Sequence, residues 1–429
     1  MKKTRARVFI ITSVIILPVA AVFLVARTRI FSQIPAGGVS RDNSPDTMIA
    51  NFEQRVQAHP QDQKSFLLLA GAYLQKVRET ADVSYYQKID GLMNRAEAIN
   101  KDNPEVSATR ATVALGRHHF RDAAILGEQL VAAAPRTPRY YGILTDACVE
   151  LGRYADAAAA LQKMVDLRPD FSSFSRISYL RELHGDIKGA EQAMEQAVDS
   201  GAAFPENIAW AYTELGKLYL RSDLNRAGEL FDRALQIKKD YPAALEGLGL
   251  VAFARNDNAK AEKFFAQAYS GLPIAQFAID LGNLSLEQKN KTTADQYFTL
   301  AKIAFEKSLT SGVDTDLEYA VFLADHDKDL PLALEKARTG YENRPGIFGA
   351  DTLAWVLYKN GNFEEAARLI AKAMALGEHT PATLFHAGMI EDALGHTQKA
   401  RYYFERVQAL HPNFSIQYSG LVQEKLQNP

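Results

Sequence analysis

Three aspartates with alternate spacing come closest, in this chain, to a known ligand-binding pattern. Asp325, Asp327 and Asp329 stand at the first, third and fifth positions of a possible calcium loop, where carboxylates supply oxygen ligands. That loop requires glycine at its sixth position and glutamate at its twelfth, whereas the chain has Leu330 and Lys336 there. The pattern therefore argues against a calcium site.

Histidine, cysteine and glycine motifs give no better case for chemistry. His118 and His119 are adjacent in a predicted turn, and neighbouring side chains point apart, so a shared metal is not expected. Cys148 is the only cysteine, which excludes an internal disulfide and a cysteine-based zinc site, and we expect it to be a small core residue. Gly247 and Gly249 lack a preceding strand and a third glycine, so helix packing explains them.

The sequence therefore predicts no catalytic, cofactor-binding or metal-ligating residues, and a protein that is not an enzyme. It contains no P-loop, no H-E-x-x-H and no G-x-S-x-G. With 49 Lys and Arg against 51 Asp and Glu, the net charge of −2 also removes the basic field expected of a nucleic-acid binder. The chemistry left to consider is recognition of another protein.

A repeated pattern of small and apolar residues organises most of the chain. The repeats are separated by 34, 33, 38, 33, 33, 39, 33 and 34 residues. The two long steps predict extra loop residues at Asp199–Ile208 and around Ser308–Val313. We place the repeat starts at Pro104, Pro138, Phe171, Ala209, Pro242, Ala275, Asp314, Ile347 and Pro381.

Small residues recur at fixed places within each unit. Alanine or glycine at the eighth and twentieth positions allows two helices to cross closely, and glycine in the turn supplies a left-handed backbone at least cost. The eighth position is glycine at Gly216, Gly249, Gly282 and Gly388, and the turn glycines are Gly152, Gly185, Gly361 and Gly395. Each unit is therefore expected to be one helix–turn–helix that must stack on its neighbours.

The period and these landmarks resemble the tetratricopeptide repeat (TPR) superfamily from Asp46 onwards. The strongest local matches are Glu150–Asp170 and Asp351–Gly377. The resemblance implies an all-α, right-handed α-solenoid that holds a protein or peptide partner in its concave groove. More narrowly, the chain is similar to membrane-anchored bacterial TPR proteins of unassigned activity. The family's lysine and asparagine clamp for a C-terminal carboxylate is not found at the corresponding positions.

The same resemblance locates a groove on the first helix of each pair. In the last three units its positions carry aromatic, acidic and methionine side chains, a combination that favours peptide binding because aromatics bury large areas at low entropic cost. The alternative is that these rings pack between adjacent units. The predicted partner-binding residues are Tyr319, Phe322, Phe348, Asp351, Trp355, Tyr358, Phe385, His386 and Met389.

The N-terminal segment predicts attachment to a membrane. Val8 to Ala26 is nineteen residues without a charge, long enough to cross most of a hydrocarbon core of about 30 Å. An uncleaved signal anchor is predicted, with secretion after signal cleavage as the alternative, because signal peptides usually have an apolar region of only about 7–15 residues. Basic residues before this run outnumber the two arginines after it, which places the N-terminus in the cytoplasm and the repeats on the extracytoplasmic side of the inner membrane.

These observations predict one organisation and one leading function. The expected parts are a cytoplasmic N-terminus at 1–7, a transmembrane helix at 8–26, a flexible linker at 27–45, a solenoid of a cap helix and about ten repeats at 46–412, and a C-terminal capping helix at 413–429. The expected function is that of a membrane-anchored scaffold or adaptor in the bacterial envelope. Alternatives are a homo-oligomeric assembly protein and an enzyme or metal-handling accessory factor. The oligomeric state stays open.

Overall fold

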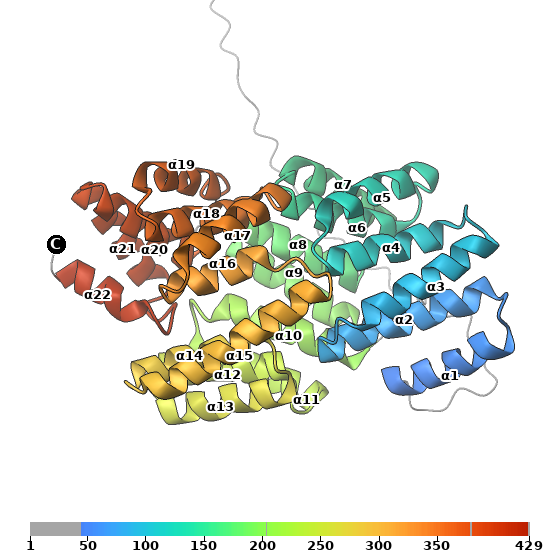
Figure 1. The fold of residues 1–429 in the computed structure, drawn as a ribbon, viewed down its shortest axis with the longest axis horizontal. Coiled ribbons are helices and arrows are strands. Elements are labelled where there is room, and N and C mark those ends of the chain that lie inside the picture. Colours follow the sequence, from blue (N-terminus) through green and yellow to red (C-terminus); the bar gives the residue numbers. More distant parts are fainter. Residues whose placement is uncertain (1–43, 203, 378–379, 428–429) are drawn as a thin grey trace, which may run out of the picture.

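The structure is built from stacked pairs of antiparallel helices. The computed structural model describes residues 44–202, 204–377 and 380–427, and all regular structure in these ranges is α-helical. Ten helix pairs follow one another along the chain, with a single helix before the first pair and another after the last (Figure 1). The prediction of an all-α solenoid of helix pairs is confirmed for these residues.

The helix bounds agree with the repeat period. The N-terminal half contains α1 (Pro45–Ala58), α2 (Gln63–Thr80), α3 (Tyr85–Ile99), α4 (Pro104–Gly116), α5 (Phe120–Ala133), α6 (Pro138–Glu150), α7 (Tyr154–Leu167), α8 (Phe171–Leu183), α9 (Ile187–Ser200), α10 (Pro205–Tyr219) and α11 (Leu224–Ile237). The C-terminal half contains α12 (Pro242–Ala254), α13 (Asn258–Gly271), α14 (Ala275–Glu287), α15 (Lys291–Thr310), α16 (Asp316–Asp325), α17 (Leu330–Asn343), α18 (Ile347–Lys359), α19 (Phe363–Ala373), α20 (Pro381–Ala393), α21 (Thr397–Leu410) and α22 (Ser419–Gln427).

Local sequence explains where these helices begin and end. Proline occupies the first turn of several first helices, where its missing N–H costs nothing. At the start of α8, Asp170 and Ser173 form a reciprocal capping box. The predicted turn glycines have positive φ, for example 79° at Gly361. In other units the same left-handed turn position is held by a non-glycine residue such as Asn256, at a φ of 61°.

Close packing between the two helices of a pair depends on glycine. A Cβ atom added at Gly282 would lie 2.3 Å from Cε1 of Phe298, and one added at Gly249 would lie 2.4 Å from Cε1 of Phe265. Both rings are buried and have no room to move aside. The predicted role of glycine at the eighth position is therefore confirmed, and its physical basis is an aromatic ring of the second helix resting on the backbone of the first.

The two predicted rim loops differ from the structure. The unit expected to start at Ala209 starts at Pro205, so most of Asp199–Ile208 is helical. The extra residues of the other long step extend α15 to Thr310. In both places insertion lengthened a helix, because a hydrogen-bonded turn satisfies more backbone groups than an exposed loop does.

The array curves until distant repeats touch. His118, between α4 and α5, contacts the carbonyl oxygen of Asp314 through Nδ1 across 2.7 Å, and the Asp314 amide donates to the carbonyl of Arg117. One unit further along, the Arg344 guanidinium pairs with Glu150 at 2.9 Å. The orange helices α16 and α17 accordingly lie beside the blue and teal repeats in Figure 1.

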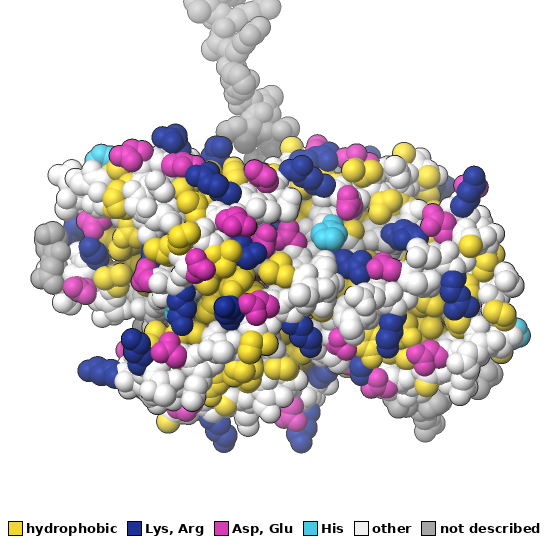
Figure 2. Space-filling view, viewed as in Figure 1, with side chains coloured by type: hydrophobic (Ala, Val, Ile, Leu, Met, Phe, Trp, Pro, Cys, Tyr) yellow, Lys and Arg dark blue, Asp and Glu magenta, His cyan; other side chains and the backbone are white. Residues whose placement is uncertain are grey.

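The surface of the array carries both signs of charge. Figure 2 shows acidic and basic side chains interspersed over the visible face, with hydrophobic side chains gathered over α15 and α16. Within residues 44–202, 204–377 and 380–427, no helix combines the length and apolar character needed to cross a membrane. The predicted transmembrane helix at 8–26 lies outside the described residues, as does the predicted linker up to residue 43, whereas Pro45 at its end already begins α1.

The glycine–ring contact gives a first testable prediction. Gly282→Ala should lower the free energy of unfolding by about 1–3 kcal/mol, because the new methyl group overlaps the buried Phe298 ring. Thermal and denaturant melts followed by circular dichroism measure the change.

The matched control is Gly71→Ala, at an exposed glycine in the first helix of the first pair. Nothing lies within 4 Å of its added Cβ, so the higher helix propensity of alanine should leave stability unchanged or raise it by up to about 1 kcal/mol. Equal effects of the two substitutions would contradict the packing account.

Candidate functional site

The concave face of the last repeats holds a non-helical stretch of the chain itself. Residues 411–418, here called the C-terminal segment, join α21 to α22 without helical structure. Asn413 Nδ2 donates to the carbonyl oxygen of Ala254, at the end of α12, across 3.0 Å. Gln417 Nε2 donates to the carbonyl oxygen of Asp325, at the end of α16, across 2.6 Å. The segment therefore bridges first helices that belong to different repeats.

Three apolar side chains of the C-terminal segment enter the concave face. The ring of Tyr418 stacks on Phe385 with centroids 4.6 Å apart, and the ring of Phe414 lies 5.7 Å from the same residue. Ile416 is buried in a cluster that includes Leu281. Contacts of this kind combine hydrophobic burial with aromatic packing.

A buried carboxylate anchors the tyrosine of this segment. Asp325 Oδ1 accepts one hydrogen bond from the Tyr418 hydroxyl at 2.9 Å and another from Trp355 Nε1 at 2.7 Å. Burial raises the pKa of Asp325, opposed by nearby His386 and by these hydrogen bonds. Removal of either donor would leave a buried acceptor less well satisfied.

A cavity of about 580 Å³ remains beside the C-terminal segment. Its walls come from the first helices α12, α14, α16, α18 and α20, and the segment itself closes one side. Aromatic, amide and acidic side chains share the lining, including Phe348, Gln276 and Asp280. The concave surface is thus partly filled and partly open.

The structure divides the nine predicted groove residues between this cavity and the core. Four of them line the cavity: Phe322, Phe348, Phe385 and His386. The other five pack beside it or behind it: Tyr319, Asp351, Trp355, Tyr358 and Met389. Of these nine, Phe348 is the one large hydrophobic side chain that is exposed, with 39% of its surface accessible.

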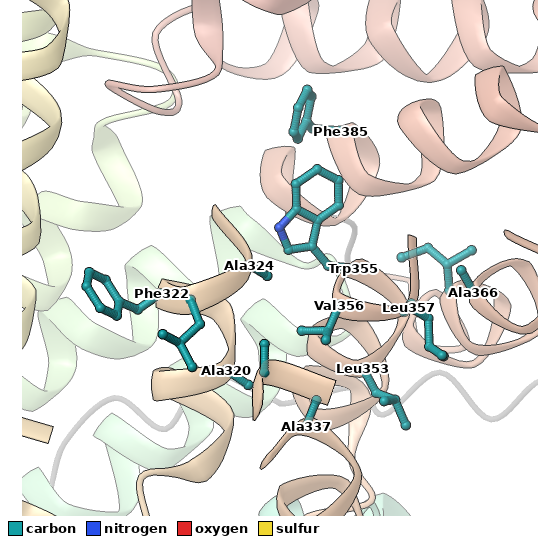
Figure 3. Packing of buried hydrophobic residues seen from close by; sticks show 14 of the residues in the cluster. Ala320, Phe322, Ala324, Ala337, Leu353, Trp355, Val356, Leu357, Ala366 and Phe385 are labelled. Carbon is teal, nitrogen blue, oxygen red and sulfur yellow. The ribbon is translucent and has the colours of Figure 1, made fainter. Parts of the chain in front are cut away.

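Trp355 is the centre of the larger group. Its indole stacks on Tyr358 and His386 at centroid distances of 5.0 and 4.4 Å. The ring of Phe385 lies 5.6 Å from it (Figure 3). His386 in turn contacts Asp351 through Nδ1 at 3.0 Å. Trp355 and Phe385 are 1% and 0% exposed, so replacing either with alanine would cost about 3–5 kcal/mol of core packing.

Tyr319 and Phe322 form a second aromatic group on α16. Tyr319 stacks on Phe305 with centroids 5.1 Å apart, and Phe322 lies 5.7 Å from the same ring. Both are buried, and Phe322 also lines the cavity. Their contacts in this structure are therefore those of the alternative stated above, in which the rings pack between adjacent units. Partner binding by the nine residues stays a prediction.

The three spaced aspartates have separate structural roles. Asp325 accepts hydrogen bonds in the concave face, Asp327 pairs with Lys359 at 2.7 Å, and Asp329 caps the N-terminus of α17. Each of the three side chains therefore has partners of its own within the chain: two hydrogen-bond donors for Asp325, a lysine for Asp327 and a helix end for Asp329.

Sequence reasoning missed the occupant of the groove. The last residues, 413–429, were expected to form a capping helix, but α22 begins at Ser419. Phe414, Ile416 and Tyr418 alternate with polar residues directly after a proline, and a period of two indicates extended chain with one apolar side. This alternation in the sequence could have indicated that the segment is not helical and has one apolar side.

Comparison with known proteins agrees with this geometry. The tetratricopeptide repeat family matches residues 109–170 and 352–413. These two matches, together with the stacked helix pairs, support a protein of the tetratricopeptide repeat superfamily. Proteins with this fold generally bind other proteins, and the stacked pairs and concave surface described above are its characteristic features.

Two individual proteins show how far the similarity of this TPR chain extends. It is 26% identical over 206 residues to "Cellulose synthase operon protein C" of Pseudomonas fluorescens (strain SBW25), a match that covers 46% of this chain and 16% of that protein. A solved structure of the APC/C hetero-tetramer Cut9–Hcn1 is 15% identical with a TM-score of 0.50, covering 74% of this chain and 61% of that one. The second similarity concerns the fold alone.

His411, the first residue of the C-terminal segment, gives a prediction about pH. Burial, and to a smaller extent the charge of nearby Arg221, together lower the pKa of His411 from 6.5 to about 4. The docked segment therefore holds His411 neutral, whereas the exposed imidazole of a released segment binds a proton below about pH 6.5. Release should become more favourable as pH falls from about 6.5 to about 4, and should be independent of pH above that window.

Tryptophan fluorescence measures this release. The chain has two tryptophans, so Trp210→Phe leaves Trp355 as the reporter beneath Tyr418. Its emission should shift to longer wavelength as the segment leaves at acidic pH. Adding His411→Gln should flatten the profile between pH 6.5 and 4, and a profile unchanged by that substitution would contradict the assignment.

Proposed function

We propose that this protein is a scaffold whose concave face binds an extended segment of a partner polypeptide, in exchange for its own C-terminal segment. The observation that carries the proposal is that the concave face already holds a polypeptide. It does so through the kinds of contact that a partner would use: a stacked tyrosine, a buried isoleucine and amide hydrogen bonds. A groove that accepts one non-helical polypeptide segment presents the shape and chemistry for another.

The same contacts explain how such binding could be regulated. The C-terminal segment is tethered to the array through α21, so its effective concentration at the groove is high and a partner must compete with it. The segment has few hydrogen bonds to the array, and no regular secondary structure holds it there. Exchange is therefore a smaller step than unfolding of any helix pair.

An exchange experiment tests this proposal. The probe is a dye-labelled peptide of residues 411–427, and its binding to two forms of the protein is followed by fluorescence anisotropy. A chain carrying Phe414→Ala and Tyr418→Ala should bind the probe at least about tenfold more tightly than the unmodified chain, because its own segment no longer competes and each aromatic pair contributes about 0.5–1.5 kcal/mol beyond its buried area.

Two controls accompany the exchange measurement. Tyr402→Ala removes a tyrosine that is 54% exposed on α21 and should leave probe affinity unchanged. A probe with both aromatic residues replaced by alanine should not bind. Equal affinity of both chains for the intact probe, or no binding to either, would refute exchange at the concave face.

We further propose that residues 8–26 anchor the array in the inner membrane, with the repeats on the extracytoplasmic side. The support is the uncharged run of nineteen residues and the excess of basic residues before it. Anchoring would confine the scaffold to two dimensions and raise its local concentration near membrane-bound partners.

Alkaline extraction tests the anchor. Isolated membranes should retain the full chain at high pH, whereas a chain that begins at residue 44 should be released into the soluble fraction. Release of the full chain would refute anchoring. Protease added to spheroplasts should digest the repeats, and protection of the repeats would reverse the proposed orientation.

A further inference from the structure

At one end of the cavity lies a carboxyl group with one oxygen that has no hydrogen-bond partner in the described part of the chain. Asp280, on α14, is 6% exposed and lines the cavity. Its Oδ1 accepts a hydrogen bond from Gln276 at 2.9 Å, but its Oδ2 is buried and has no hydrogen-bond partner among the described residues. Buried polar atoms are nearly always paired, so an orphaned carboxylate oxygen that borders a cavity indicates a donor yet to be supplied.

The charges around Asp280 indicate which kind of donor is missing. Glu246, on α12, lines the same cavity, and no cation lies at ion-pair distance from either carboxylate in the described parts of the chain. Lys217, on α10, is the nearest cation that influences both groups, but its ammonium group is paired with Glu214 at 3.2 Å. Two acids therefore face one space with their nearest cation already engaged.

The remaining charged groups of the cavity have partners of their own. Arg344 pairs with Glu318 at 2.7 Å and with Glu150 at 2.9 Å. His386 contacts Asp351, and Asp325 accepts hydrogen bonds from tryptophan and tyrosine. In the described part of the chain, Asp280 and Glu246 are thus the acids of the cavity with neither an ion pair nor an aromatic donor, and both lie at the end formed by α12 and α14.

We infer that this end of the cavity receives the cationic side chain of a lysine or arginine, with Asp280 and Glu246 as counter-ions. The inference rests on the proposed function, since it specifies a residue of the partner polypeptide. An ammonium or guanidinium group supplies both an N–H donor for the orphaned oxygen and a positive charge between two acids, whereas a neutral donor supplies only the first. The aromatic and aliphatic lining suits the methylene stem of such a side chain.

The protonation of Asp280 provides an independent signature. Burial, followed by repulsion from Glu246, raises the pKa of Asp280 well above its ordinary value. In the empty cavity a proton therefore occupies the site at pH values below that raised pKa, and a cation must displace it. Affinity for a cation should rise with pH until Asp280 is ionised and then level off, with net proton release in the rising part.

The test uses the full chain and two small probes of equal size. Nα-acetyl-lysine-N-methylamide carries the proposed ammonium group, and the N-methylamide of Nα-acetyl-2-aminoheptanoic acid, whose pentyl side chain has the same number of heavy atoms, ends in a methyl group instead. Isothermal titration should show at least about tenfold tighter binding of the lysine amide, because charge-assisted hydrogen bonds are roughly twice as strong as neutral ones. Titration in two buffers of different ionisation heat should reveal the released proton.

Matched variants separate the site from general electrostatics. Asp280→Asn should weaken lysine amide binding at least about tenfold and abolish the proton release, while Asp232→Asn, on the exposed face of α11, should change neither. Glu246→Gln supplies a second test at the same site should Asp280→Asn disturb folding. Unchanged affinity in both site variants, equal binding of the two probes, or no binding of the lysine amide would overturn the inference.

Failure of the cationic subsite can be distinguished from failure of the proposed function. If the 411–427 peptide exchanges as described while the lysine amide fails to bind, the groove binds polypeptide and only the cationic subsite is wrong. If the peptide also fails to exchange, both proposals are wrong.

Discussion

Each helix pair of this protein can bury its apolar side only against the next pair, and that constraint determines the rest of the structure. Within a pair, rings such as Phe298 rest on a glycine backbone, which brings the two helices close together. Repetition of that close contact along ten pairs produces a curved array with a concave inner face. The curvature is strong enough for the turn before α5 to meet the residues before α16.

Closure of the array changes the nature of its inner face. In an open solenoid, the aromatic side chains of the first helices would face solvent and wait for a partner. Here the C-terminal segment crosses that face, and Trp355 and Phe385 become core residues beneath Tyr418 and Phe414. The protein thus stabilises a hydrophobic surface that would otherwise be exposed, while a cavity next to the segment keeps part of the surface accessible.

Local features of this fold could be predicted from the sequence, because each is determined by neighbouring residues. The helix-pair period, the close approach at Gly282 and the left-handed turn at Gly361 all follow from such short-range patterns. The start of α10 at Pro205 was misplaced because an insertion was assumed to form a loop. The burial of Trp355 could not be predicted, since it depends on a segment about sixty residues away in sequence that the repeat pattern does not include.

Occupation of the concave face by residues 411–418 is the central claim, and hydrogen exchange of the intact chain measures it most directly. The side chains of Ile416 and Tyr418 are held in the array, and the Ser419 and Val422 amides donate to carbonyls at the end of this segment. The account predicts that peptides covering 414–422 exchange far more slowly than an unstructured chain, and that Phe414→Ala with Tyr418→Ala accelerates this exchange while α18 stays protected. Exchange of 414–422 at the unstructured rate in the unmodified protein would contradict it.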